Sequence, residues 1–277
     1  MYADDTNISV SASNSKDIEA RLNYDLNNIK TWLEANKLSL NVAKTEFLLL
    51  GSSARLFSLV KTPSIELGNV PINQVHFAKS LGITIDETLS WNKQIDLCCA
   101  KISKAINGLK LARPFVPQHV LMMIYKALVL PLFDYCDVVW GNLNLGLTER
   151  LQKLQNRAAR IITKSEYSIR SADILDKLHW DNLEKRRFQH KATLMYKILN
   201  NLTPSYLNVY QKLKEQTDYN LRGQDTNLVL PKPRTEYLKR SFQCDGAKIW
   251  NSLPSPTKKS KTTVHFRRNL GNASLHC

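Results

Sequence analysis

The spacing of apolar residues changes along the chain after about residue 90. Before that point, short apolar runs alternate with turn residues, a pattern that predicts short strands. Beyond it, apolar residues recur at three- and four-residue steps, which predicts helices that bury one face. We therefore expect an α+β first part followed by a mostly α-helical remainder.

One helix is expected within the first part. Residues 13–15 offer capping side chains, and a stripe of apolar residues follows to about Asn36. This helix should lie on an antiparallel sheet. The expected strands are residues 2–3, 6–10, 38–50, 65–67, 70–72 and 76–85.

Three helices are expected between residues 91 and 165. The first spans residues 91–111 and ends before Pro114. Pro117 fits the first turn of the second, which runs to about Val129, and Thr148 is the expected N-cap of the third. A helix pair should follow over residues 171–201. Beyond Pro204 the pattern is irregular apart from one apolar cluster: Phe242, Ile249, Trp250 and Leu253.

The charge of the chain is strongly basic. Its 39 Lys and Arg residues outnumber 24 Asp and Glu residues, which gives a formal charge of +15. Such a balance favours a polyanionic partner, although a solvated basic surface is the alternative. The third helix carries a basic stripe at three- and four-residue steps, so several of its cations could contact one phosphate backbone. The members are Arg150, Lys153, Arg157, Arg160 and Lys164.

Cysteine and histidine usage points to no metal or disulfide framework. The five Cys residues form no Cys-x-x-Cys pair, and an odd number argues against complete pairing. The six His residues are scattered and are expected at the surface or in caps. We find no secretory leader and no apolar run long enough to cross a membrane, so we expect an intracellular protein, cytoplasmic or nuclear.

The sequence Tyr2-Ala3-Asp4-Asp5 is the strongest candidate for chemistry. Carboxylate oxygens are the ligands that Mg²⁺ prefers. Neighbouring residues on a strand point to opposite faces, however, so Asp4 and Asp5 cannot build a two-metal site without a further carboxylate. The alternative is a polar turn that contains two Asp residues.

Several blocks of sequence together resemble one family, over nearly the whole chain. They occur in the order found in the carboxyl half of the reverse transcriptases of LINE-type (non-long-terminal-repeat) retrotransposons. The blocks are residues 2–5, 38–45, 81–91, 124–135 with 140–141 and 155–161, and 250–254.

The resemblance implies roles for particular residues. Asp4 and Asp5 match the palm carboxylates that bind Mg²⁺, and Lys44 matches a lysine near the incoming triphosphate, with an ordinary strand-edge lysine as the alternative. Residues 81–86 match the primer-grip hairpin. Lys79 beside it, together with the basic stripe, is assigned to contact an RNA template and DNA primer or another duplex.

The resemblance also implies how the chain divides into regions and which segments of the family it would lack. Residues 1–90 correspond to part of a palm, residues 91–165 to a thumb-like region, and residues 166–277 to a basic helical and irregular region. In the family, the fingers and the strand with the other metal-binding Asp would lie upstream of Met1. We therefore expect a polymerase fragment that is inactive alone; the alternative is a non-catalytic basic module that binds nucleic acid.

Overall fold

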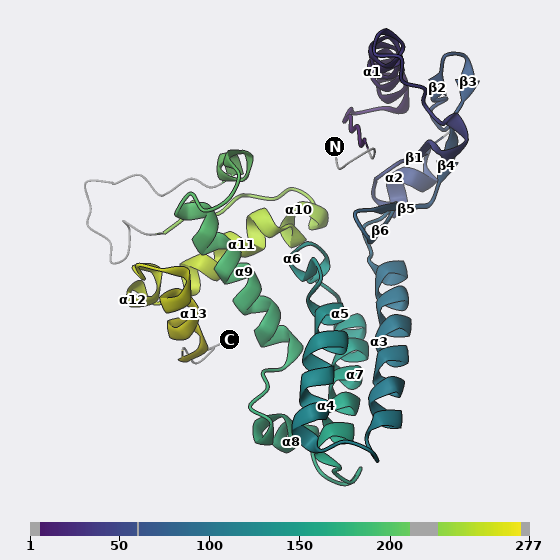
Figure 1. The fold of residues 1–277 in the computed structure, drawn as a ribbon. Helices are drawn as coiled ribbons and strands as arrows, with labels where there is room; N and C mark the ends of the chain where they lie inside the picture. The colour runs from purple at the N-terminus through teal and green to yellow at the C-terminus, as the bar shows by residue number, and fades with distance from the viewer. Residues whose placement is uncertain (1–5, 60, 211–226, 273–277) are drawn as a thin grey trace, which may run out of the picture. The chain divides into compact units, whose positions relative to one another are not determined.

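The computed structural model describes residues 6–59, 61–210 and 227–272. The chain divides into two compact units, Met1–Gln94 and Ile95–Cys277, which are described separately (Figure 1). The palm and thumb assignments remain predictions. Within the described ranges, no helix is both long enough and apolar enough to cross a membrane.

The predicted helix of the first unit is present as α1 (Ser15–Ala35). The Asn14 side chain caps it by accepting a hydrogen bond from the backbone N–H of Asp17 at 2.8 Å. Leu26 on α1 is 7% exposed and packs in a small apolar cluster with Ile65, Leu67 and Ile72. A short helix, α2 (Ser53–Phe57), follows later in the unit.

The strands of the first unit form three separate two-stranded sheets (Figure 1). β1 pairs with β4 in parallel, whereas β2–β3 and β5–β6 are antiparallel hairpins. The expectation of one antiparallel sheet is therefore wrong. The hairpin continues past Pro71, since the Ile72 N–H donates to the Ile65 carbonyl at 2.8 Å, and β4 then begins at Asn73 and pairs with β1. The strands are β1 (Glu46–Leu48), β2 (Glu66–Leu67), β3 (Val70–Pro71), β4 (Asn73–Val75), β5 (Phe77–Ser80) and β6 (Ile83–Asp86).

Two expected strands are wrong or shortened. Residues 6–10 are irregular, and within residues 38–50 only β1 is a strand. Just before β1, the 3₁₀ turn η1 (Val42–Lys44) forms because the Asn41 carbonyl accepts from both the Lys44 N–H and the Thr45 hydroxyl. Residues 2–3 lie outside the described ranges.

The second unit consists of helices (Figure 1). The apolar stripes of the first and third expected helices lie largely in its core, whereas the second expected helix leaves Ala127 and Leu128 exposed. Side chains of α3, α4 and α7 such as Ile102, Leu121 and Leu151 are fully buried. The first helices are α3 (Asn92–Ala112), α4 (Gln118–Ile124), α5 (Leu130–Asp134), α6 (Asp137–Trp140), α7 (Leu145–Thr163) and α8 (Ser171–Lys177). The later helices are α9 (Leu183–Leu199), the 3₁₀ helix η3 (Ser205–Tyr210), α10 (Glu236–Arg240), α11 (Phe242–Ser252), α12 (Ser255–Lys258) and α13 (Thr263–Asn272).

Two helix ends differ from expectation. α7 is capped by Asn144, whose side chain accepts from the Leu147 N–H at 2.9 Å, so the prediction of Thr148 as N-cap is wrong. The second predicted helix does not stop near Val129. It passes through a π turn, η2 (Tyr125–Val129), into α5, whose first turn contains Pro131.

The predicted apolar cluster near residue 250 forms a second core between α9, α11 and α13. Trp250 and Leu253 are buried, and Phe242 and Ile249 pack against them. Phe266 of α13 is fully buried and stacks on Tyr196 of α9, with ring centroids 4.4 Å apart.

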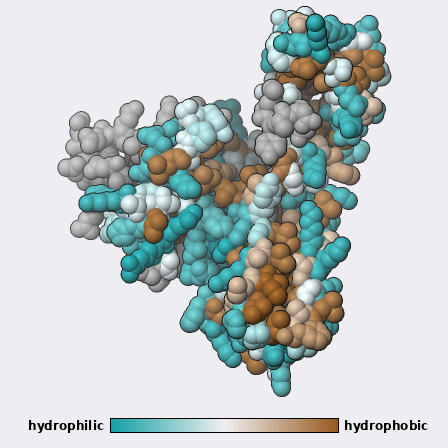
Figure 2. All heavy atoms as spheres, viewed as in Figure 1, coloured by the Kyte–Doolittle hydropathy of each residue, from teal (hydrophilic) through white to brown (hydrophobic). Residues whose placement is uncertain are grey.

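An apolar patch is exposed on the second unit. Figure 2 shows apolar side chains gathered over α4 and η2. Met123 and Leu128 in these turns are 65% and 63% exposed. This face of the helix is therefore left open to solvent.

Candidate nucleic-acid interface

The predicted metal ligands Asp4 and Asp5 lie outside the described residues, so their role in binding Mg²⁺ remains a prediction. Lys44 is described: it is the last residue of η1 and its side chain is exposed. Lys44 lies two residues before β1, which begins at Glu46, and not within the strand expected over residues 38–50; its place near a triphosphate remains a prediction.

The hairpin β5–β6 is the segment predicted to act as a primer grip. Leu81 and Gly82 form its turn with φ of 46° and 82°, the positive values that a tight type I′ hairpin requires. Lys79 on β5 is exposed and lies opposite Thr84 on β6. The backbone N–H of Thr84 donates to Gln94 Oε1 at 2.9 Å, which ties the hairpin to the start of α3.

Asp86 organises the turn between this hairpin and α3. Its carboxylate accepts from the Thr88 hydroxyl at 2.8 Å and from the backbone N–H groups of Ser90 and Trp91 at 2.9 and 2.8 Å. Burial acts to raise the pKa of Asp86, but the hydrogen bonds from Ser90, Thr88 and Trp91 prevail and hold it below its usual value. Leu89 and Trp91 in this turn have positive φ.

Two members of the predicted basic stripe connect α7 to α3. Arg150 Nη2 lies 2.7 Å from Asp96 Oδ1, and Arg157 Nη2 donates to Asn107 Oδ1 at 2.9 Å. The hydrogen bond to Asp96 raises the pKa of Arg150. Both arginines are exposed, so these contacts fix their positions without removing them from solvent.

Arg160 differs from the other members of the stripe because it is partly buried. Its Nη2 donates to the Ile169 carbonyl at 2.8 Å, its Nη1 to Ser171 Oγ at 3.3 Å, and its guanidinium lies 5.2 Å from the Tyr167 ring centre. These contacts hold the loop between α7 and α8. Nη1 and Nη2 of Arg160 thus each donate one hydrogen bond within the protein, while its buried Nε has no hydrogen-bond partner among the described residues.

The remaining members of the stripe are exposed lysines. Lys153 lies on α7, and Lys164 follows it in the left-handed conformation, where its N–H bonds the Arg160 carbonyl. The spacing of the stripe on α7 was predicted from sequence, but the lysines of the adjacent helix α3 were not. Lys104 and Lys110 of α3 lie three residues before and after Asn107, and both are exposed. We call the exposed cations of these two helices that lie within four residues of Arg157 or Asn107 along the chain the α3–α7 seam. Its members are Lys104, Lys110, Lys153 and Arg157.

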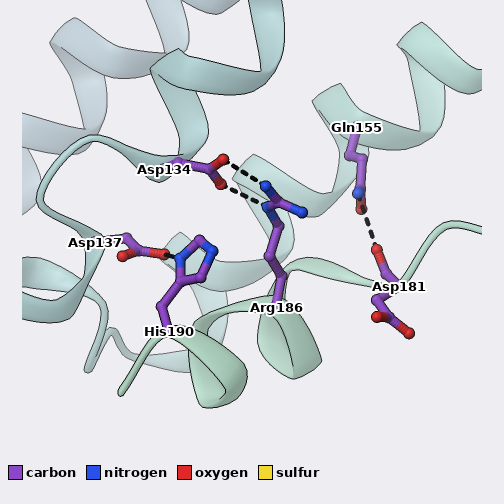
Figure 3. Close-up of polar contacts among 6 residues, drawn as sticks. All are labelled: Asp134, Asp137, Gln155, Asp181, Arg186 and His190. Atoms are coloured by element: carbon purple, nitrogen blue, oxygen red, sulfur yellow. Dashed lines mark hydrogen bonds and ion pairs between the residues drawn. The ribbon is translucent and has the colours of Figure 1, made fainter. Parts of the chain in front are cut away.

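A second polar cluster anchors α9 and was not predicted (Figure 3). Arg186 donates from Nε and Nη2 to the two oxygens of Asp134, both at 2.6 Å, and His190 Nδ1 lies 2.6 Å from Asp137 Oδ2. Asp134, Asp137 and His190 are close enough to share a metal ion. Both Asp134 oxygens, Asp137 Oδ2 and His190 Nδ1 are engaged in these bonds, which fix α5 and α6 against α9.

Comparison with known proteins adds to these observations. The chain is 27% identical over 194 residues to a Drosophila melanogaster protein called probable RNA-directed DNA polymerase from transposon BS. It is 29% identical over 116 residues to the probable RNA-directed DNA polymerase from transposon X-element of the same organism. The chain is similar to transposon RNA-directed DNA polymerases. This finding confirms the resemblance inferred from the sequence blocks.

The similarity covers much of this chain but only a small part of each transposon polymerase. The two matches cover 69% and 40% of this chain but only 21% and 13% of the relatives. The longer match exceeds the length of either compact unit, so it includes residues of both. No family model and no solved structure matches the chain.

Proposed function

We propose that this chain is a portion of the RNA-directed DNA polymerase of a non-long-terminal-repeat retrotransposon. The observation that carries the proposal is the similarity to two transposon polymerases. The Tyr2-Ala3-Asp4-Asp5 sequence and the later blocks in family order support it. Since the chain spans only 21% and 13% of these relatives, the activity of a whole polymerase is itself part of the proposal.

In this proposal Asp4 and Asp5 hold Mg²⁺, for which their carboxylate oxygens are suitable donors. The bound ion would activate a primer hydroxyl and neutralise phosphate charge. Lys44 would neutralise the pyrophosphate leaving group. Asp4 and Asp5 are adjacent, so a two-metal site would need a further carboxylate besides these two.

An incorporation assay tests the catalytic part. The 277-residue chain alone, with a primed RNA template and Mg²⁺ or Mn²⁺, is expected to add no nucleotides because Asp4 and Asp5 do not complete a two-metal site by themselves. Template-dependent incorporation that disappears in Asp4→Ala would show that these residues suffice and would overturn the fragment interpretation.

We further propose that the second unit binds duplex nucleic acid through the α3–α7 seam. The contact between Arg157 and Asn107 keeps the two helices adjacent, so cations of both can follow one phosphate backbone. Each phosphate that such a cation neutralises releases counterions, and binding then depends on salt and little on sequence. The contacts of Arg160 make it a positioning residue for this surface.

A fluorescence titration with an RNA–DNA duplex at several salt concentrations tests this surface. Lys153→Ala combined with Arg157→Ala should weaken binding and flatten the salt slope by about one to two units. The matched control, Arg170→Ala with Lys177→Ala, removes two exposed cations elsewhere in the unit and should change the slope less. Equal slopes in the two double variants would show that the seam is only a solvated surface.

The ion pair between Arg150 and Asp96 gives a second readout of the same surface. Asp96→Asn removes a competing carboxylate and leaves the Arg150 guanidinium available to phosphate, so affinity should rise. Glu149→Gln removes an exposed negative charge next to Arg150 and controls for charge alone. If both substitutions raise affinity equally, Arg150 takes no direct part in binding.

A further inference from the structure

A cavity of about 260 Å³ lies in the second unit, apart from the α3–α7 seam. The connection from α6 to α7 forms one wall, and α9 and α11 form the others. Its walls combine apolar side chains with a set of polar ones. The polar lining residues are Asn142, Thr148, Glu184, Arg187, Lys191 and Asp245.

Arg187 is the unusual member of this lining. It is 5% exposed, and its Nε and Nη2 find no hydrogen-bond partner among the described residues. Its guanidinium lies 5.2 Å from the ring centre of the buried Trp140. Burial lowers the pKa of Arg187, while Asp137 and Glu184 oppose that effect. An arginine side chain keeps its charge even so, and buried donors without acceptors are costly.

The backbone beside this arginine is shaped to admit it. A Cβ atom at Gly141 would lie 2.2 Å from the Asp137 carbonyl oxygen and 3.1 Å from Cδ of Arg187. Only glycine lets the chain pass this close to both. The conjunction of Trp140 and Gly141 therefore creates the place in which the guanidinium is held.

The other charges near the cavity have partners within the protein. Lys191 Nζ lies 2.7 Å from Asp245 Oδ2 and also bonds Asn142. Asp137 is paired with His190. Glu184 lines the cavity but is exposed to solvent. The donors of Arg187 are thus the ones that these neighbours leave unsatisfied.

We propose that this cavity binds a phosphate group through Nε and Nη2 of Arg187, which are closed off from the cavity in the structure and reach the ligand when the side chain turns toward it. These two nitrogens form one edge of the guanidinium, whose parallel N–H groups match two oxygens of a phosphate. A phosphate has a third oxygen, for which the Thr148 hydroxyl in the same lining is a donor. Lys191, one turn after Arg187, is paired with Asp245 and so adds little net positive charge, and the carboxylate of Glu184 opposes the ligand.

The phosphate can be a free ion or belong to a nucleotide, and the two sources are separable. The full chain is titrated with inorganic phosphate, AMP and acetate at constant ionic strength, by calorimetry and by the melting temperature. Phosphate or AMP should bind and raise the melting temperature, because a ligand that binds only the folded state stabilises it. Acetate should bind more weakly. Binding of AMP alone would assign the cavity to nucleotides.

Substitutions tie the binding to Arg187. Arg187→Met keeps the length of the side chain without its donors and should weaken binding about tenfold or more. Arg187→Lys should not restore it, because an ammonium lacks the paired donors. Glu184→Gln should strengthen binding by removing a repulsive charge. Arg268→Met, which removes an exposed cation on α13, should leave binding unchanged.

Three results would overturn the proposal: no binding of either phosphate ligand, acetate binding as tight as phosphate, or unchanged phosphate binding in Arg187→Met. If Arg187→Met does not fold, Glu184→Gln decides the question, and a lack of tighter binding counts against the site. The Lys153→Ala, Arg157→Ala variant should bind phosphate normally. A result that refutes phosphate binding in this cavity can therefore be distinguished from one that refutes nucleic-acid binding by the α3–α7 seam.

Discussion

The first unit is built from two-stranded sheets and one long helix, whereas the second is built from helices around shared cores. Of the described residues, the first unit buries six apolar side chains, and the most buried of these, Ile65, is 2% exposed. In the second unit many apolar side chains, including Ile95, Trp140 and Phe266, are fully buried. Burial of apolar surface is the main favourable term in folding, so the second unit should supply most of the stability.

The difference shows that short, two-stranded sheets limit the stability of a small unit. An isolated pair of strands is marginally stable in water. Each strand of the first unit has one neighbour among the described residues, so every pair leaves backbone groups at open edges. The parallel pair β1–β4 is only three residues long. α1 covers part of this surface but does not close it.

The largest expected effect is in hydrogen exchange. Amides in the interior of α9 should exchange about a thousandfold more slowly than those of β5 and β6, a difference of about 4 kcal/mol in opening free energy. Amide exchange followed by mass spectrometry measures this directly. Equal protection in both units would show that the first unit has a stability that its small sheets do not explain.

Truncation of a core side chain in each unit sharpens the comparison. Phe266→Ala should lower the free energy of unfolding of the second unit by about 3–5 kcal/mol, because a fully buried ring leaves a cavity. Leu26→Ala in the first unit should cost less, about 2–3 kcal/mol, since its smaller side chain is 7% exposed. Urea denaturation measures both. Phe57→Ala, at a ring that is 95% exposed, serves as the control.

The smallest effect concerns pH and falls on the first unit. The pKa of Asp86 is lowered from its usual value of 3.8, so the carboxylate stabilises the folded state above that pH. This stability is lost as the pH falls through the lowered pKa. Asp86→Ala should cost about 1 kcal/mol at pH 7, as loss of a capping side chain does. Thermal melts between pH 2 and about pH 7 should show less acid dependence in this variant.

Asp86→Asn provides the matched control for this carboxylate. The amide oxygen can still accept some of the hydrogen bonds but carries no charge, so the variant should lie between wild type and Asp86→Ala at pH 7. A variant as stable as wild type at every pH would show that the charge of Asp86 contributes nothing to folding.

The elements that could be predicted from sequence are those set by local periodicity. The apolar stripes of α1, α3 and α7 gave the right helices because each stripe is continuous along the chain. The strands of the two local hairpins were also predicted near their observed positions, whereas the single antiparallel sheet was wrong because β1 pairs in parallel with β4, a partner distant in sequence. Cap positions failed for a smaller reason: Asn144 and Thr148 are both good caps, and packing chose between them.

The candidate sites follow the same rule: residues related by local spacing could be predicted, and contacts between residues distant in sequence could not. The basic stripe on α7 follows from its spacing, but only the fold shows that Arg160 turns its donors to a loop while Lys153 stays exposed. The pairing of Asp134 with Arg186 joins residues 52 apart in the sequence. No periodicity relates such positions, so the buried cluster and the cavity beside Arg187 could not be anticipated.

The π turn η2 sets the register of the helix that passes through it. Leu121, Tyr125, Val129 and Phe133 are all buried, although they recur at every fourth residue. In a regular α-helix each such step overshoots a full turn by about 40°, so the last residue would lie about 120° away from the first. The wider π turn absorbs this drift. Deletion of one residue from the segment would therefore act as a shift of phase, turning Phe133 away from the core although no apolar residue is lost.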